Sequence, residues 1–448
     1  MRGFEHISAL YNDHLALALA PALTPSGIEK DPHFFSGEII EPLVISRGLL
    51  VLADIVSTRY FKFIPTALRD PVLSAQGDRL RAECFSACNG VYARFDLLQD
   101  ALDGEISFGT TNVDIGMGLR KALTQVKQGD RLRLDIGDEG LRALHTQKKD
   151  PELSKITKLI YERPVEMPDR WIRALGNCVP IHKNMKKVFD IRGVVAKNFI
   201  AMLPSASGKE RSGWLTYSKT GVQLLQRAGK DGVYISGLHR LSSLKRVMSD
   251  VKTIDFYAPQ DGEKGPMMVV VKLSGANLVL SLTAQSYQGY SGEGALLESL
   301  AQIEVVENAD AVLSVLQFDP KIDKKKLSTM LYLSEEEVDF ALALLAVSGK
   351  LGYDVEEESY FHRELPEEPD RVLKDNPRLV SAKKLLNNIT PDGEHRWLVH
   401  SNGTDYRVIY DSSKELSEAK CTCAWYLRHQ NNRGPCKHIL AVKFFEES

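Results

Sequence analysis

The amino-acid sequence predicts an α+β protein made of several domains. Three observations support this prediction: segments rich in β-branched and aromatic residues extend to about residue 300, helical periodicity follows, and cysteines gather with a histidine near the C-terminus. A chain of 448 residues with 43% hydrophobic content is long enough for about three domains. We divide it into a mixed α+β region at 1–180, a β-rich domain or lobe at 181–300, a helical module with a hairpin at 301–365, and a linker helix with the cysteine cluster at 366–448.

The first region is expected to contain antiparallel strands and one helix. Strands are predicted over Gly37–Phe63, Arg79–Phe85 and Val91–Leu97, because their β-branched and aromatic residues are separated by glycine-containing turns. A helix is predicted over Met117–Gln125, followed by a strand over Arg131–Ile136. This order of elements favours an α+β domain.

The second region is expected to form an antiparallel sheet. Its predicted strands are short and are separated by turns that contain glycine. They are Trp214–Tyr217, Val222–Arg227, Val233–Ser236, Met267–Leu273 and Asn277–Thr283.

The third region predicts three helices and a β-hairpin. Ala309–Phe318 and Lys324–Leu333 are apolar at helical spacing, and Ser334 with Glu337 forms a capping box that opens a third helix. A hairpin is predicted around a tip of three glutamates, Glu356 to Glu358. This order resembles a winged helix, a fold that often reads DNA. Residues 309–363 carry six basic and eleven acidic side chains, a net charge of −5, which favours a protein-docking module over phosphate contact.

The residues that demand specific chemistry are Cys421, Cys423, Cys436 and His438. Two cysteines at i and i+2 point to the same side of an extended segment, and the second pair falls where a helix is expected to begin. Three thiolates and one imidazole complete a tetrahedral zinc shell with no position for water or substrate. We therefore predict one structural zinc ion. The alternative is that these cysteines are small buried hydrophobic residues.

The sequence around these ligands closely resembles the SWIM zinc finger, whose pattern is CxC, a variable spacer and CxH. The resemblance implies a β-hairpin ahead of the first cysteine pair and a helix that carries the second pair. Trp397–His400, Tyr406–Tyr410 and Pro435–Phe445 can supply these elements. His429 is expected to stay outside the zinc shell.

The order of parts resembles a family of bacterial SWIM zinc finger proteins of about this length. Further similarity lies in Thr111-Asn112-Val113-Asp114 and in the stretch from Tyr360 to Leu365. Such proteins look like companions of MoxR-type AAA+ ATPases and von Willebrand A (VWA) domain proteins. The resemblance implies membership of an ATP-driven remodelling or conflict-defence system. Our first hypothesis is a non-enzymatic, zinc-containing adaptor that binds protein partners through its winged helix and N-terminal surfaces.

The second hypothesis is a nucleic-acid-binding factor that uses the finger to contact DNA or RNA. The segment from Cys421 to Phe445 has no acidic residue and has aromatic side chains beside its cations. The candidate contacts are Arg428, Arg433, Lys437 and Lys443. Eight basic and eight acidic residues balance over 391–448, and the whole chain carries −2, so the attractive field is weak.

No complete catalytic motif is present, so we predict that the protein is not an enzyme. A third hypothesis, a hydrolase, would have to use Asn112 and Asp114 or the region of Glu293. No apolar run approaches the ~20 residues of a membrane-spanning helix, and we expect a cytoplasmic protein with reduced thiols. The other cysteines are expected in the core. They are Cys84, Cys88 and Cys178.

Overall fold

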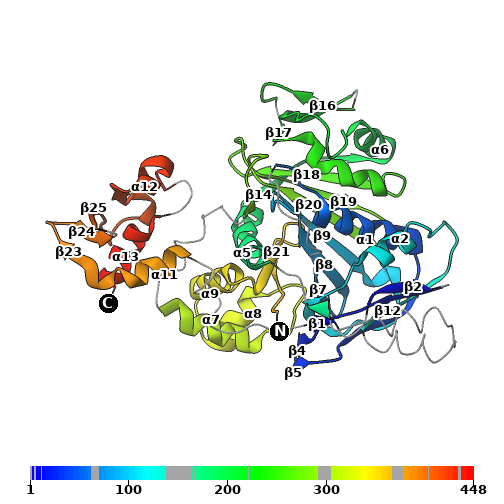
Figure 1. The fold of residues 1–448 in the computed structure, drawn as a ribbon, viewed down its shortest axis with the longest axis horizontal. Coiled ribbons are helices and arrows are strands. Elements are labelled where there is room, and N and C mark those ends of the chain that lie inside the picture. The colour runs from blue at the N-terminus through cyan, green and yellow to red at the C-terminus, as the bar shows by residue number, and fades with distance from the viewer. Residues whose placement is uncertain are drawn as a thin grey trace.

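The computed structural model of the chain describes residues 3–4, 7–11, 13–61, 70–137, 163–164, 168–219, 221–229, 231–290, 304–365, 377–401, 403–431 and 435–447. These residues form helices and several sheets whose strands are mostly antiparallel, which confirms the predicted α+β class (Figure 1). No helix in the described part of the chain combines the length and the apolar character needed to cross a bilayer.

A ten-stranded antiparallel sheet forms the largest element of the fold. In spatial order its strands are β14 (Met185–Arg192), β18 (Thr253–Pro259), β19 (Met267–Lys272), β20 (Ala276–Leu282), β9 (Val91–Leu98), β8 (Arg79–Phe85), β7 (Val72–Gln76), β11 (Phe108–Asn112), β4 (Ala22–Thr24) and β5 (Gly27–Glu29). β9 pairs with β20 from Val91 opposite Leu282 to Leu97 opposite Ala276. The sheet therefore continues across the boundary predicted at residue 180.

Smaller sheets and helices pack around this sheet. A five-stranded sheet contains β10 (Leu102–Asp103), β6 (His33–Ile39), β12 (Leu132–Gly137), β3 (His14–Leu17) and β2 (Ala9–Tyr11). The other small sheets are β16 (Gly221–Leu225), β15 (Gly213–Ser218) and β17 (Val233–Ile235), and the pair β1 (Gly3–Phe4) and β13 (Arg163–Pro164). The helices here are α1 (Pro42–Ser57), α2 (Met117–Leu123), α5 (Asp169–Lys183), α6 (Gly193–Met202), and the 3-10 helices η1 (Gln99–Ala101) and η2 (Leu238–Val247).

The strand predicted over Gly37–Phe63 is wrong for most of its length, because α1 occupies its centre. Pro42 at the first helical position pre-sets the backbone angle that a helix needs. α1 packs against β8, β9 and η2, and most of its residues are buried. A mostly apolar run of this kind fits a buried strand as well as a buried helix. Gly48 lies against the Phe95 ring of β9, where a Cβ atom would overlap the ring.

Three helices and a hairpin follow, as predicted. They are α7 (Glu304–Val315), α8 (Lys324–Leu331), α9 (Glu335–Val347), β21 (Leu351–Asp354) and β22 (Ser359–His362). Both hydrogen bonds of the capping box form: the Glu337 backbone N–H donates to Ser334 Oγ (3.2 Å), and the Ser334 N–H donates to the Glu337 carboxylate (2.7 Å). The name winged helix for this module stays a prediction.

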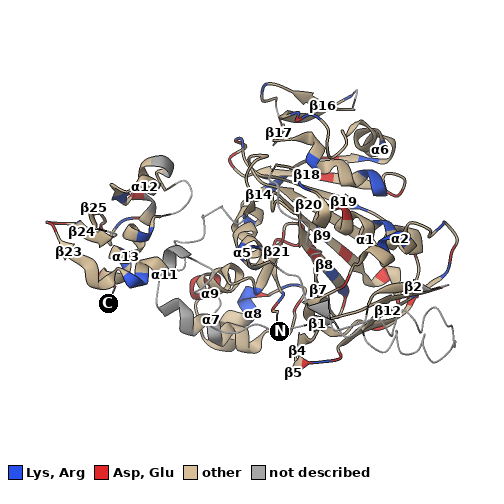
Figure 2. Cartoon of the chain, in the orientation of Figure 1, with Lys and Arg blue, Asp and Glu red and all other residues tan. Residues whose placement is uncertain are grey.

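The hairpin is anchored to the ten-stranded sheet by buried ion pairs. Asp354 on β21 accepts hydrogen bonds from Arg81 of β8 (2.6 Å) and Arg94 of β9 (2.8 Å). Glu83 of β8 pairs with Arg363 at 2.6 Å. All five side chains are at least 96% buried. Figure 2 shows these charged residues within β8 and β9, two central strands of the sheet.

The tip of the hairpin also contacts the sheet. Glu356 forms an ion pair with Lys272, and Glu357 forms one with Arg79 at 2.8 Å. The ring of Phe361 lies 4.1 Å from the Arg81 guanidinium carbon. The hairpin is therefore engaged within the molecule and is not a free wing.

The C-terminal part has a hydrophobic core of its own. Its elements are α11 (Pro377–Lys384), η5 (Leu386–Asn388), β23 (Ile389–Pro391), β24 (Arg396–Ser401), β25 (Thr404–Ile409), η6 (Leu416–Glu418), β26 (Lys420–Cys421), α12 (Ala424–His429) and α13 (Lys437–Glu446). The four strands form one antiparallel sheet, and α13 packs against it. The buried residues of this core all fall between Ala382 and Phe444. In Figure 1 this part, orange to red, lies at the opposite end of the molecule from α1 and α2.

Candidate metal centre

The four predicted zinc ligands come from one strand end and two helix starts. Cys421 is the last residue of β26, and Cys423 precedes α12 as its N-cap. Cys436 is the N-cap of α13, and His438 lies in the first turn of the same helix. All four side chains are buried, and no more than 5% of any of them is exposed. The fold thus joins two pairs that are separated in the chain.

The geometry of the four ligand atoms fits one zinc ion. They all lie within 4.8 Å of one another. His438 Nδ1 is 3.8 Å from Cys421 Sγ and 4.0 Å from Cys436 Sγ. A tetrahedral zinc site with Zn–S of about 2.3 Å and Zn–N of about 2.0 Å separates S and N by about 3.5 Å, so small shifts would complete the shell. Four protein ligands leave no open position, which is typical of structural zinc.

Backbone N–H groups surround the sulfur atoms. The Cys423 N–H donates to Cys421 Sγ (3.4 Å), and the Tyr426 N–H donates to Cys423 Sγ (3.5 Å). Hydrogen bonds from Cys421 and Cys436 lower the pKa of the Cys423 thiol. A dication then favours loss of the remaining thiol protons.

The His438 imidazole is oriented by an aromatic neighbour. Its ring stacks on Tyr406 of β25, with centroids 4.3 Å apart and planes 22° from parallel. Nδ1 faces the sulfur atoms, and Nε2 is buried without a hydrogen-bond partner in the part of the chain that the structure describes. Nδ1 is therefore the nitrogen available to the metal.

Comparison with known protein families agrees with this geometry. Residues 406–445 match the SWIM zinc finger. This part of the chain is a SWIM zinc finger. The match begins at Tyr406, which stacks on His438, and ends at Phe445 of α13, so it spans every zinc ligand. The predicted hairpin, represented by β24 and β25, and the predicted ligand-bearing helix, represented by α13, are both present.

Solved structures similar to the chain include two of proliferating cellular nuclear antigen (PCNA) proteins. Proliferating cellular nuclear antigen from Entamoeba histolytica has 12% sequence identity and a TM-score of 0.34, covering 56% of this chain and 99% of its own. The PCNA2–PCNA3 complex from Sulfolobus tokodaii has 11% identity and a TM-score of 0.33, covering 55% and 98%. At these TM-scores neither likeness carries a conclusion about this chain. No curated protein matches it.

The predicted nucleic-acid contacts are only partly described by the structure. Lys443 is buried, with 8% exposed, and pairs with Glu447 at 3.6 Å. Lys437 Nζ donates to Ser401 Oγ (2.9 Å) on β24. Arg428 lies on α12 but its side chain is outside the described atoms, and Arg433 lies outside the described residues. Both described lysines are thus already bonded within the SWIM finger.

A basic face that the sequence analysis missed lies on the outer side of the finger sheet. Arg396, Arg407 and Lys420 are exposed on three adjacent strands, and Asp405 is the acidic residue of β25 on the same side. Arg396 lies opposite Ile409, which in turn lies opposite Lys420. The alternation of outward residues with buried ones in β24 and β25 could have revealed this face, but only after the strand register was known.

The residues of the hydrolase hypothesis do not form an open site in the described structure. The Asn112 side-chain amide is buried and donates to the backbone oxygen of Asp70 (3.1 Å). Asp114 is also buried and accepts a hydrogen bond from the Ser8 N–H (3.0 Å). Glu293 lies outside the described residues.

The other three cysteines, Cys84, Cys88 and Cys178, are buried as predicted. The exclusion of His429 from the zinc shell stays a prediction, because its side chain is outside the described atoms.

Proposed function

We propose that this protein is a non-enzymatic, zinc-containing adaptor that binds protein partners through its helical module and its N-terminal surfaces. The observation that carries the proposal is an exposed aromatic side chain at the junction of α8 and α9. Tyr332 is 96% exposed, and its backbone is left-handed with φ of 57°. Met330, in the last turn of α8, is 49% exposed.

Tyrosine and methionine are enriched in protein interfaces, where both supply large contact areas. Tyrosine does so with only two side-chain torsions, and methionine adapts its flexible chain to the partner surface. The left-handed position is unfavourable for a bulky side chain, and here it ends α8 while presenting the ring to solvent. The hairpin of the module contacts the ten-stranded sheet instead. The helical side of the module is therefore the surface that we assign to a partner.

The zinc ion has a structural role in this proposal. Its four ligands fill the tetrahedron, so the site offers neither an activated water nor a position for substrate. We infer from the similarity to companions of MoxR-type ATPases that the partners are an AAA+ ATPase and a VWA-domain protein. The adaptor would then belong to a bacterial cytoplasmic system driven by ATP hydrolysis.

Affinity purification from the native host tests the adaptor function. We expect the full-length protein to retain an AAA+ ATPase or a VWA-domain protein, identified by mass spectrometry, and a Tyr332→Ala, Met330→Ser variant to lose it by at least about tenfold, because interface tyrosines often contribute 2 kcal/mol or more. Tyr287→Ala is the matched control, since Tyr287 is another exposed tyrosine, 65% accessible. Equal recovery of partners by all three proteins would refute the assignment of this surface.

The basic outer face of the SWIM finger supports a second candidate function, binding of a nucleic-acid backbone. Arg407 has 76% of its side chain exposed, with Asp392 3.9 Å away. Arg396 and Lys420 extend the positive charge across the neighbouring strands. Ile409 between them is 47% exposed and could contact a sugar or base.

We expect the intact protein to bind double-stranded DNA no more tightly than about 10⁻⁴ to 10⁻⁶ M at physiological salt, the range of non-specific contact. Changing Arg396, Arg407 and Lys420 to glutamine should lower the dependence of log K on log salt by about one unit for every phosphate that the variant no longer neutralises. Lys437→Gln serves as the control, because that ammonium already bonds Ser401. Fluorescence anisotropy over a salt series measures both quantities, and nanomolar binding that survives the triple substitution would exclude this face.

A further inference from the structure

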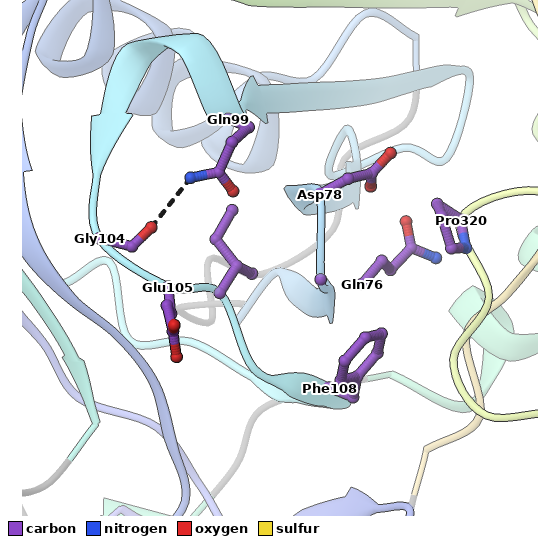
Figure 3. Close-up of a pocket in the computed structure, with 9 residues that line it drawn as sticks. Gln76, Asp78, Gln99, Gly104, Glu105, Phe108 and Pro320 are labelled. Carbon is purple, nitrogen blue, oxygen red and sulfur yellow. Dashed lines mark hydrogen bonds between the residues drawn. The ribbon is translucent and has the colours of Figure 1, made fainter.

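A hollow of about 660 Å³ lies where the ten-stranded sheet meets the helical module. Its walls come from the turn between β7 and β8, the loop that runs from η1 to β11, and the connection between α7 and α8 (Figure 3). The lining residues that matter most are Gln76, Asp78, Glu105, Ile106, Phe108 and Pro320. The hollow is distinct from the zinc site and from the surface assigned to Tyr332.

The side-chain oxygen of Gln76, in the wall of the hollow, receives no hydrogen bond from the described residues. Gln76 is 1% exposed, and its Nε2 donates to the backbone oxygen of His362 (2.9 Å) and points toward that of Asp319 (3.5 Å). These two carbonyls settle the orientation of the amide, because the opposite orientation would place oxygen against oxygen. Among the described residues, Oε1 is then a buried acceptor without a hydrogen-bond partner. Figure 3 shows the amide between Asp78 and Phe108, with its nitrogen on the side of Pro320. A buried acceptor of this kind favours a ligand that donates hydrogen bonds.

The rim of the hollow is acidic. Glu105 and Asp78 are both exposed, and the stretch 99–108 contains three carboxylates and no basic residue. Arg79 binds both oxygens of Asp78 (2.9 and 2.7 Å) and also pairs with Glu357 (2.8 Å), so it offsets only one of these two carboxylates and does not reach the charge of Glu105. Within the described residues Glu105 has no ion-pair partner. The field at this end of the sheet therefore attracts cations.

An aromatic ring forms one side of the hollow. Phe108 is 43% exposed and lies directly across from Gln76 in the pairing of β11 with β7. Its ring packs on Gly77, whose φ of +79° and lack of a Cβ allow the close approach. A ring face beside carboxylates is the arrangement that binds ammonium or guanidinium groups.

We infer that this hollow receives an arginine side chain presented by a protein partner. The planar guanidinium has five N–H donors, enough to serve Gln76 Oε1 and the Glu105 carboxylate while it lies along Phe108. The methylene stem would contact Ile106 and Pro320. A side chain suits the site better than a free small molecule, because the exposed rim of Asp78, Glu105 and Phe108 does not enclose a ligand. The inference rests on the adaptor function and names the chemistry of one partner contact.

The test uses zinc-loaded full-length protein and a fluorescein-labelled peptide, Gly-Gly-Arg-Arg-Gly-Gly, followed by anisotropy at physiological salt. We expect saturable binding that is lost when citrulline, the neutral isostere, replaces both arginines. Glu105→Gln should weaken binding by about tenfold, because a charge-assisted hydrogen bond is removed. Phe108→Leu should weaken it by about fivefold. Glu415→Gln, an exposed carboxylate of the SWIM finger, makes the same charge change elsewhere and should leave binding unchanged.

Unchanged binding in both pocket variants, or equal binding of the citrulline peptide, would overturn the inference. Equal or tighter binding of free agmatine at the same residues would also overturn it in favour of a small-molecule site. The adaptor function is judged separately by affinity purification. If the wild-type protein and the Glu105→Gln, Phe108→Leu variant retain the same partners, the adaptor function is supported and the arginine contact is refuted. If the wild type retains no partner but the peptide binds as expected, the adaptor function is refuted and the pocket is supported.

Discussion

Replacing Cys421 and Cys436 with alanine is expected to abolish zinc binding and to unfold the SWIM finger. The change removes two of four ligands, and structural zinc in small domains contributes apparent binding free energies of about 10–16 kcal/mol at pH 7. The finger core, from Ala382 to Phe444, is too small to replace this contribution by apolar burial. Elemental analysis should show one zinc per chain in the wild type and none in the double variant.

Hydrogen exchange then locates the unfolded part. Amides of β24, β25 and α13 should lose protection, whereas β9 and β20 of the ten-stranded sheet should keep it, because their core is separate from that of the finger. Cys178→Ala is the matched control, since Cys178 is a buried cysteine outside the zinc set and should leave the zinc content unchanged. Full zinc content in the double variant would disprove the ligand assignment.

Replacing Asp354 with alanine is expected to destabilise the larger part of the protein by about 3–5 kcal/mol, the cost of removing one carboxylate from a buried ion-pair network. Arg81 and Arg94 would both lose their hydrogen bonds to this carboxylate, and the buried Asp96, 3.4 Å from Arg81 and 3.0 Å from Arg94, would be left to balance two guanidinium groups. Urea unfolding, with amide exchange in β9 and β21 as the local probe, measures the change. Glu358→Ala is the control, because Glu358 is exposed at the tip of the same hairpin and should change stability by less than about 0.5 kcal/mol.

The buried Asp354 carboxylate should also make the stability of the protein depend on pH. Burial alone raises the pKa of Asp354, but attraction from Arg94 and Arg81 outweighs it and holds the pKa well below its ordinary value. Because the pKa is lowered in the folded state, the contribution of Asp354 to the free energy of unfolding is complete above the ordinary pKa of about 3.9 and is lost as the pH falls below it. The wild type should therefore lose stability more steeply than Asp354→Ala in acid. Parallel acid titrations of the two proteins would contradict this assignment.

Local sequence patterns determined the metal centre and most short elements. The i, i+2 spacing of Cys421 and Cys423 and of Cys436 and His438 predicted the zinc shell, because ligand chemistry restricts residue type and spacing within a few positions. Ser334 and Glu337 predicted the start of α9 for the same reason: a capping box depends on atoms three residues apart. Strands such as β8 and β9 were recognisable from β-branched and aromatic residues between turns.

Tertiary structure decided what depends on contacts between distant residues. α1 is a helix despite its strand-like composition, because the sheet and η2 bury most of its residues and a mostly apolar run fits a buried strand as well as a buried helix. The pairing of β9 with β20 and of Asp354 with Arg81 joins residues far apart in the chain, and no local pattern encodes which strands or charges meet. The arginine pocket also depends on distant contacts. The sheet and the helical module come together around Gln76 and bury its Oε1, which receives no hydrogen bond from the described residues.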